Sequence, residues 1–384
     1  MQPVYLDYNA TTPVLPEVQA AMQPYWSEHF ANAASPHLLA KEVSDAVAEA
    51  RATIAHLLGV TAREIIFTSG ATEALNLAIQ GLAATYKPTE RRHILVAATE
   101  HKAVLEPALR LRETGFEVET LPVTPDGLVT PAALQAHVRP TTLLVAIMLA
   151  NNETGVIQPV QKLVEVTHQA GAFFLCDTTQ AIGKVPVSFG ELGVDMAVLS
   201  AHKFYGPKGV GALYIRRRSG VRLRPLLLGG GHEEGLRSGT LAVPLIIGMA
   251  AALKAVSQRL SEEIPRLTHL RNRLEDGIRA LYAEARVHGA QAPRLPNTTN
   301  IAFPGLKASD LLARMPYLAV ATGSACTSAK PEPSHVLLAM GVPADVAKSS
   351  LRFSLGLPTT EAEVDLALSY LQKALALQKP HPYS

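Results

Sequence analysis

The chain has 384 residues and a formal net charge of +2, with 48% hydrophobic and 18% charged residues. This length exceeds what one hydrophobic core usually supports, so we predict two packed domains. The small net charge favours no nucleic-acid partner, and the longest uninterrupted apolar run, residues 143–150, is too short to span a bilayer. We therefore expect a globular protein that binds neither nucleic acid nor a membrane.

The two cysteines, Cys176 and Cys326, cannot build a disulfide framework, and the sequence contains no Cys-x-x-Cys motif for a metal. We predict no metal site and a reducing compartment, the cytoplasm. Residues 7–13 are polar and turn-forming, in place of a charged leader followed by an apolar run, so we also expect no signal peptide.

Apolar runs of strand length alternate with helical patterns along the first two thirds of the chain. The predicted strands are residues 64–68, 93–97, 142–150, 173–176, 196–199 and 210–216, and the predicted helices between them are residues 71–86, 102–113 and 160–171. Continuous apolar strands indicate burial on both faces. The pattern predicts an α/β fold with a mainly parallel sheet covered by helices.

A helical stretch over residues 243–281, which we expect to be interrupted near Pro265, leads into a second region with its own strand and helix signals. We predict a large domain over residues 15–259. Residues 1–14 and 260–384 are predicted to form a smaller α/β domain.

Ligands of open parallel sheets bind beyond the carboxyl ends of the strands, so polar residues at those ends are candidates for a site. Asp177 directly follows the apolar strand 173–176, and Gln180 comes one short turn later. A carboxylate at the mouth of a buried strand is costly unless it meets a cation, such as a protonated pyridine nitrogen. A helix cap explains Asp177 equally well at this point.

Lys203 ends the motif at residues 200–203, which follows the next apolar strand and precedes the glycine-rich residues 206–209. A lysine there can be desolvated into the neutral amine that Schiff-base chemistry requires, although an isolated lysine would more often be a surface residue in a turn. Because the acid follows one strand and the lysine follows the next, the two can hold a pyridine ring between them. We therefore predict a pyridoxal-phosphate enzyme with Lys203 as its Schiff-base residue.

The first predicted strand is followed by a turn at residues 68–73, Thr-Ser-Gly-Ala-Thr-Glu, where a glycine leads into a helix. The free N–H groups of such a helix can hold a phosphate. A plain capped helix start explains the same residues, and the sequence contains no Walker-type or dinucleotide glycine pattern.

These strand-end motifs carry a family resemblance. Residues 69–73, 99–102, 151–155, 177–180 and 200–203 occur in the order and approximate spacing of the cysteine desulfurases, as do residues 6–12, 230–233, 237–240, 323–328 and 352–356. Over nearly its whole length the chain resembles the NifS and IscS type, within the class-V aminotransferases. The resemblance implies the pyridoxal-phosphate fold type I and a homodimer with shared active sites.

Carried over by position, the resemblance implies that Lys203 forms the Schiff base and later removes the α-proton, while Asp177 holds the pyridinium nitrogen. His101 would stack on the ring and shuttle a proton, and Gln180 would bond the ring hydroxyl. The other implied ligands are Ala71, Thr72, Ser200 and His202 for the phosphate, Thr240 for the phosphate of the partner subunit, Asn152 for cofactor and substrate, and Arg352 for the substrate carboxylate.

Cys326 resembles the nucleophilic cysteine that attacks the sulfur of substrate cysteine, which leaves an enzyme persulfide and releases alanine. Its neighbours in residues 323–334 are small and polar, whereas Cys176 follows the apolar residues 173–175 as an inert structural cysteine does. The resemblance implies L-cysteine as the substrate, pyridoxal 5′-phosphate as the cofactor, and a sulfur acceptor or an iron–sulfur scaffold protein as partner.

Three readings remain open from the sequence alone. They are a cysteine desulfurase, another enzyme of the same cofactor class such as an aminotransferase or a selenocysteine lyase, and a non-catalytic sulfur carrier. An aminotransferase has no need of Cys326, and a carrier has no need of Lys203 and Asp177. The cysteine desulfurase is therefore the favoured interpretation.

Overall fold

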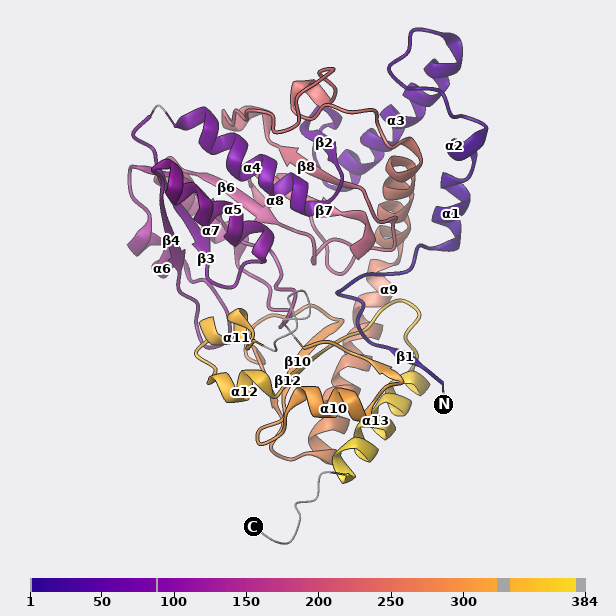
Figure 1. Cartoon of the computed structure of the whole chain (residues 1–384), viewed down its shortest axis with the longest axis vertical. Helices are drawn as coiled ribbons and strands as arrows, with labels where there is room; N and C mark the ends of the chain where they lie inside the picture. Colours follow the sequence, from indigo (N-terminus) through magenta and orange to yellow (C-terminus); the bar gives the residue numbers. More distant parts are fainter. Residues whose placement is uncertain (1, 88, 323–331, 378–384) are drawn as a thin grey trace.

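The computed structural model describes residues 2–87, 89–322 and 332–377. Within these residues a seven-stranded sheet forms the centre of the larger part, in the order β2-β8-β7-β6-β5-β3-β4 (Figure 1). Its strands are β2 (Ile65–Thr68), β3 (His93–Ala97), β4 (Glu117–Leu121), β5 (Thr142–Ala146), β6 (Phe173–Asp177), β7 (Met196–Ser200) and β8 (Gly211–Ile215). All neighbouring pairs are parallel except those of β8, which is antiparallel to both β2 and β7. The predicted fold class is therefore correct.

Helices cover both faces of this sheet, which explains why its central strands are apolar throughout. The helices up to residue 281 are α1 (Pro16–Met22), α2 (Pro24–Ser27), which packs on α1 and α9, α3 (Leu38–Leu57), α4 (Ala71–Tyr86), α5 (Lys102–Arg110), α6 (Pro131–His137), α7 (Val160–Gln169), α8 (Phe189–Leu192) and α9 (Val243–Leu281). Successive side chains of a strand enter opposite cores. Leu175 and Val198 pack under α4 and α5, whereas Cys176 and Leu199 pack under α3, α7 and α9.

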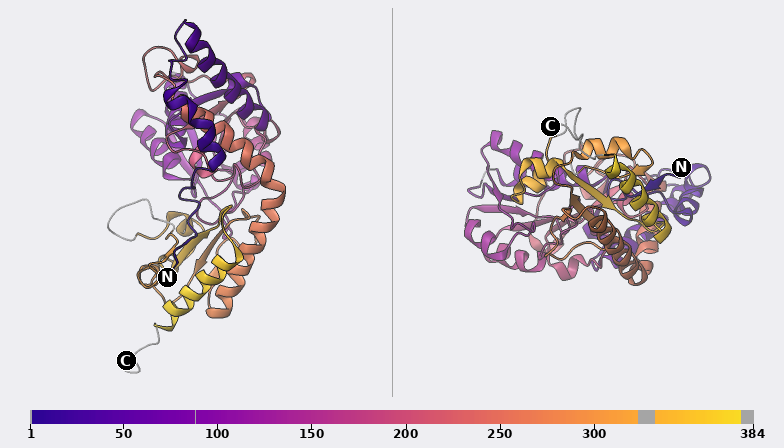
Figure 2. Two further views of the ribbon diagram at one scale, coloured as in Figure 1. Left: turned by 90° about the vertical axis from the view of Figure 1, so that its right-hand side faces the viewer. Right: turned by 90° about the horizontal axis from the view of Figure 1, so that it is seen from below.

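The smaller part contains the antiparallel sheet β12-β10-β9 and the parallel pair of β1 (Val4–Tyr5) with β11 (Leu318–Ala319). Its remaining elements are β9 (Arg286–Val287), β10 (Thr298–Ala302), α10 (Ala308–Arg314), α11 (His335–Ala339), α12 (Ala344–Lys348), β12 (Ser350–Ser354) and α13 (Glu361–Ala376). Both the first and the last described residues lie in this part, with β1 beside α13 (Figure 2). The chain thus begins in the smaller part before it enters the larger one.

Helix α9 runs without interruption through Pro265, so the predicted break at this residue is wrong. Pro265 is exposed, and a carbonyl that loses its helical partner on an exposed face can bond to water. Packing holds the helix together on both sides of the proline, because its first half enters the core of the large sheet and Leu267, Leu270 and Leu274 enter the core of the smaller part. The boundary near residue 260 lies inside this helix and stays a prediction.

Among the described residues, α9 is the one helix long and apolar enough to cross a membrane by length and composition. Its apolar side chains, Ile246, Met249 and Leu253 among them, are buried against the large sheet and α3. This is the packing of a core helix.

The predicted strand over residues 142–150 is shorter in the structure, because β5 ends at Ala146. Beyond it the chain still follows its neighbour, with Ile147 N–H donating to the Leu175 carbonyl at 3.0 Å and Leu149 N–H to the Asp177 carbonyl at 2.9 Å. This extension carries Ala150 and Asn152 into the space between the two parts of the molecule.

Candidate active site

A cavity of about 900 Å³ lies at the carboxyl ends of the parallel strands, where the smaller part faces the sheet. Most of the residues predicted to bind the cofactor and the substrate line it: Ala71, Thr72, His101, Asn152, Asp177, Gln180, Ser200, His202, Lys203 and Arg352. These residues come from five strand ends of the larger part and from β12 of the smaller part. The site therefore depends on both parts.

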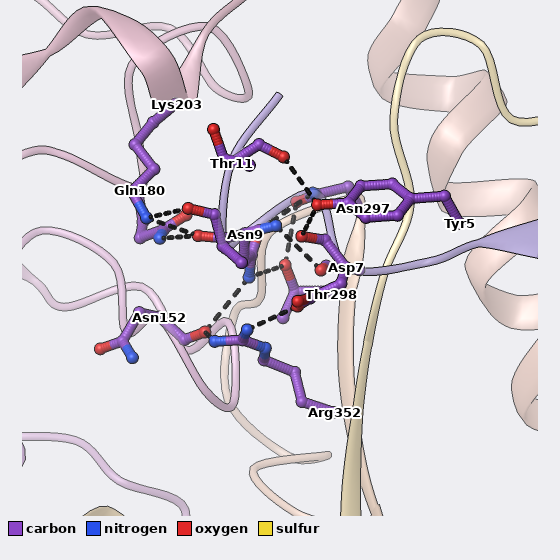
Figure 3. Close-up of polar contacts among 12 residues, drawn as sticks. Tyr5, Asp7, Asn9, Thr11, Asn152, Gln180, Lys203, Asn297, Thr298 and Arg352 are labelled. Carbon is purple, nitrogen blue, oxygen red and sulfur yellow. Dashed lines mark hydrogen bonds and ion pairs between the residues drawn. The ribbon is translucent and has the colours of Figure 1, made fainter. Parts of the chain in front are cut away.

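Lys203 lies at the end of a short 3-10 turn, Ala201–Lys203, that follows β7. Its Nζ donates hydrogen bonds to the backbone carbonyls of Asn9, at 2.7 Å, and Ala10, at 2.8 Å (Figure 3). Two fixed acceptors from the N-terminal segment thus hold the amine at the cavity wall. This is the position that a Schiff-base lysine needs.

Asp177 is the last residue of β6 and is buried. Its Oδ1 accepts a hydrogen bond from Thr179 N–H at 2.9 Å, so the carboxylate does cap the turn that follows the strand. The same side chain lines the cavity. Both interpretations of Asp177 are therefore compatible with the structure. A carboxylate that caps a turn with one oxygen can still pair with a pyridinium nitrogen in the cavity.

His101 is the N-cap of α5, and its Nδ1 accepts a hydrogen bond from Ala103 N–H at 3.1 Å. Burial lowers the pKa of the imidazole, helped by the positive charge of Lys203 and opposed by Asp177. The ring is therefore neutral at pH 7 and carries its proton on Nε2. A neutral ring in the cavity wall can stack on an aromatic cofactor and exchange a proton through Nε2.

The N-terminus of α4 provides an anion site opposite the end of β7. The helix begins at Ala71 after Gly70, whose φ of +153° favours glycine and whose missing Cβ would lie 3.6 Å from Ser200 Oγ. The first N–H groups of the helix, including those of Ala71 and Thr72, have no helical acceptor and attract a phosphate. Backbone and hydroxyl donors thus surround a space that a larger side chain would fill.

His202 lies at the same end of the cavity, where burial and the nearby cations lower its pKa to about 4. At pH 7 its ring is neutral, with Nδ1 3.2 Å from Thr11 Oγ1. His202 can therefore contribute a hydrogen bond to a phosphate, while Lys208 in the same wall is a cation that can attract it.

Gln180 belongs to a buried polar network that the sequence did not indicate. Its Nε2 donates to the Asn9 carbonyl at 3.0 Å, and its Oε1 accepts from Lys184. Lys184 Nζ also donates to Asn9 Oδ1 at 2.9 Å, and burial holds its pKa well below the usual value. The contact with Lys184 fixes the orientation of the Gln180 amide, whose Nε2 keeps its second N–H for an acceptor in the cavity.

Asn9 connects this network to the smaller part. Its Nδ2 donates to Thr298 Oγ1 at 2.9 Å and to the Asn152 carbonyl at 3.2 Å, and its N–H donates to Ser354 Oγ at 2.9 Å. Figure 3 shows Asn9 at the centre of these contacts. Asn9 and Lys184 are therefore site residues that sequence analysis missed, although Asn9 lies within the matching motif at residues 6–12.

Arg352 extends from β12 into the cavity, and its guanidinium is almost fully buried. Its Nη1 donates to the Asn152 backbone carbonyl at 3.0 Å, and its Nη2 forms an ion pair of 2.7 Å with Asp7 Oδ1. Asn152 and Arg352, which were each predicted to hold the substrate carboxylate, are thus in contact through the Asn152 backbone carbonyl. Asp7 was given no role by the sequence.

Glu153 is a second acid that sequence analysis did not assign. It lines the cavity, accepts a hydrogen bond from Ser334 Oγ, and has its pKa raised to about 7 by burial. His335, which follows Ser334 in the chain, also lines the cavity. Its Nε2 lies 2.9 Å from the Glu100 carbonyl. Both contacts tie the start of α11 to the strand ends of the larger part. An acid directly after the two asparagines 151 and 152 was the available signal for Glu153.

Three further predictions concern Thr240, Cys326 and Cys176. Thr240 is exposed and does not line it. Cys326 lies outside the described residues. Cys176 is fully buried, and burial raises the pKa of its thiol, as expected for an inert cysteine.

The family model for class-V aminotransferases matches residues 4–367. The chain belongs to the class-V aminotransferase family. It is 47% identical over 367 residues to the cysteine desulfurase IscS of Anaeromyxobacter dehalogenans (strain 2CP-C), covering 95% of this chain and 91% of the relative. The solved structure of a NifS-like protein has a TM-score of 0.91 and 39% identity over 98% of this chain and all of that chain. The structure of SspA in complex with cysteine has a TM-score of 0.81 and 34% identity, covering 92% and 98% of the two chains.

Enzymes of this family depend on pyridoxal 5′-phosphate, and the prediction of this cofactor is confirmed. The donor set of the cavity fits the group. Lys203 and Asp177 lie at the ends of adjacent parallel strands, and the α4 N-terminus opposite Ser200 offers donors for an anion. A lysine, an acid and an anion site in one cavity match the aldehyde, the ring nitrogen and the phosphate of the cofactor.

Proposed function

We propose that this chain is a cysteine desulfurase, which takes the sulfur from L-cysteine and releases L-alanine. The observation that carries this proposal is that Lys203, Asp177 and Arg352 lie in the wall of one cavity. Together they provide a covalent attachment point, a partner for a cationic ring and a carboxylate receptor. Relatives that are cysteine desulfurases by name, and a neighbour solved with cysteine, support this substrate.

Pyridoxal phosphate, when bound, withdraws electrons from the α-carbon of the amino acid. Asp177 would keep the pyridine nitrogen protonated, and the first turn of α4 with Ser200 and His202 would hold the phosphate. Lys203 would hold the cofactor covalently and would take up the α-proton at Nζ. His101 moves a proton through Nε2, because its Nδ1 is occupied by Ala103 N–H.

Arg352 and Asn152 bind the substrate carboxylate. The guanidinium fork suits a carboxylate because it can donate two parallel hydrogen bonds. The hydrogen-bonded network of Asn9, Gln180 and Lys184 forms the wall of the cavity toward the core.

Cys326 accepts the sulfur. Its thiolate forms a sulfur–sulfur bond with the substrate as the carbon–sulfur bond breaks, and the electron pair of that bond stays with the substrate carbon, which takes up a proton and leaves as alanine. Cys326 then carries the persulfide and passes it to an acceptor protein for iron–sulfur cluster assembly or other sulfur transfer. We place this reaction in the cytoplasm.

We further propose a homodimer with shared sites, in which Thr240 reaches the phosphate of the partner subunit. Exposed apolar residues beside the segment that carries Thr240 support this proposal: Leu226, Leu227 and Leu228 are 41%, 45% and 83% exposed. Apolar runs of this kind are often covered by a partner. Mixing the Lys203→Ala and Thr240→Val variants under subunit exchange tests the proposal, because a mixed dimer with shared sites contains one intact site. Activity above that of either variant alone is expected, and no gain would contradict shared sites.

The desulfurase reaction is tested by incubating the purified holoenzyme with L-cysteine and a thiol reductant and measuring sulfide and alanine together. Equal amounts of both are expected. Cys326→Ser should bind cysteine but release almost no alanine, because a hydroxyl is a far poorer nucleophile toward sulfur than a thiolate. Cys176→Ala is the matched control and should keep the activity. Normal alanine release by Cys326→Ser, or a trapped persulfide on Cys176, would refute the proposed mechanism.

A further inference from the structure

The guanidinium expected to receive the substrate carboxylate is already paired with a carboxylate of the protein. Asp7 Oδ1 lies 2.7 Å from Arg352 Nη2, and both side chains line the cavity, with 20% and 7% of their respective surfaces exposed. The remaining contact of the fork is a neutral one, from Nη1 to the Asn152 carbonyl. Arg352 Nε is buried without a hydrogen-bond partner among the described residues.

A buried guanidinium needs a counter-ion, because an uncompensated charge in a low-dielectric site costs several kcal/mol. Asp7 supplies that charge when no amino acid is bound. An incoming carboxylate offers the same charge. It can also accept two parallel hydrogen bonds from the guanidinium of Arg352. Since Asp7 is partly exposed, its carboxylate can turn toward solvent when it is released from Arg352.

The backbone of Asp7 is connected to the lysine of the site. Its carbonyl accepts hydrogen bonds from Ala10 N–H at 2.9 Å and Tyr5 Oη at 3.0 Å, which closes a turn over residues 7–10. The carbonyls of Asn9 and Ala10 in this turn are the acceptors that hold Lys203 Nζ. The Arg352 ion pair and the Lys203 hydrogen bonds are therefore made by opposite sides of one short turn (Figure 3).

We propose that Asp7 is a specificity-determining residue that acts as the resident counter-ion of Arg352 and gives way only to a ligand carboxylate. A neutral ligand cannot replace the charge of Asp7, so the site selects amino acids over amines and amides of the same size. This inference rests on the proposed function in taking the substrate to be an α-amino acid.

The test measures binding of propionate and of its neutral isostere propionamide to the holoenzyme by ligand-detected NMR. Neither probe has an amine that can react with the cofactor. Asp7→Asn should bind propionate about tenfold more tightly than the wild type, because the competing carboxylate is gone, while propionamide binding stays unchanged. Arg352→Gln should lose propionate binding. Asp345→Asn removes the same charge from an exposed position and serves as the control. In turnover, Asp7→Asn should lower the KM for L-cysteine without raising kcat.

Unchanged or weaker propionate binding by Asp7→Asn would overturn the inference, as would an equal gain for propionamide. The two proposals can fail separately. If the wild type makes no alanine from cysteine but Asp7→Asn still gains propionate affinity, the desulfurase proposal fails and the role of Asp7 stands. If turnover is present and the propionate affinities of wild type and Asp7→Asn are equal, only the role of Asp7 fails.

Discussion

Lys203 Nζ and the Asn9 carbonyl oxygen lie 2.7 Å apart, although 194 residues separate them in the chain. A lysine side chain has many rotamers, and this contact together with the Ala10 carbonyl selects one of them. The amine is thus positioned before any ligand arrives. Preorganisation of this kind lowers the entropic cost of the reaction that follows.

Lys203→Ala should abolish turnover, because the variant has no amine to attach the cofactor or to take the α-proton. The visible absorption of the bound cofactor should disappear from the purified protein. Absorption spectroscopy and an alanine assay measure both effects. Lys162→Ala, a change at an exposed lysine of α7, should keep both properties, and an unchanged spectrum in Lys203→Ala would refute the assignment.

Asp177→Asn should slow exchange of the substrate α-proton roughly a hundredfold while affecting cofactor retention far less, since the amide cannot hold a proton on the ring nitrogen. The amide oxygen can still accept the hydrogen bond from Thr179 N–H, so the turn should remain intact. Proton exchange in deuterated water, followed by NMR, measures the effect. Exchange at the wild-type rate would show that the acid is only a structural cap.

Glu153→Gln should remove a pH dependence of stability. The pKa of this glutamate rises from 4.5 to about 7 in the folded protein, so the folded state binds more protons than the unfolded state between these values. The stabilisation is complete below pH 4.5 and is lost as the pH rises through about 7. Relative to Glu153→Gln, the wild type should therefore lose about 3 kcal/mol over this interval. Denaturant unfolding at several pH values measures it, and parallel curves for the two proteins would contradict the prediction.

Lys184→Met should destabilise the protein by about 1–3 kcal/mol, because Gln180 Oε1 loses its donor in the core. The Gln180 amide also loses the contact that fixes its orientation, so cofactor affinity should fall as well. Urea unfolding and cofactor release measure the two effects. Lys162→Met is the matched control. A variant as stable as this control would mean that Lys184 has no positioning role.

The parts of the site that depend on local sequence features could be predicted from the sequence. Asp177 and Lys203 follow adjacent strands, and the ends of adjacent parallel strands necessarily meet. The burial of Lys184 could not be predicted, because a lysine is usually exposed. Its partners Asn9 and Gln180 are known only from the fold. The same holds for Asp7, whose partner lies 345 positions away. The antiparallel direction of β8 could not be predicted either, because an apolar run indicates that a strand is buried but not which way it runs in the sheet.

The N-terminal segment is the first part of the chain to be synthesised, yet some of its partners are among the last. Val4 pairs with Leu318, and Asn9 N–H bonds Ser354 Oγ, so these contacts must wait until most of the protein has left the ribosome. Contacts of such long sequence separation also form slowly. A nascent chain that has completed the large sheet therefore lacks the contacts with Leu318 and Ser354 that help to place the turn beside Lys203. Productive capture of the cofactor is expected to be a late event in folding, after Ser354 has joined the structure.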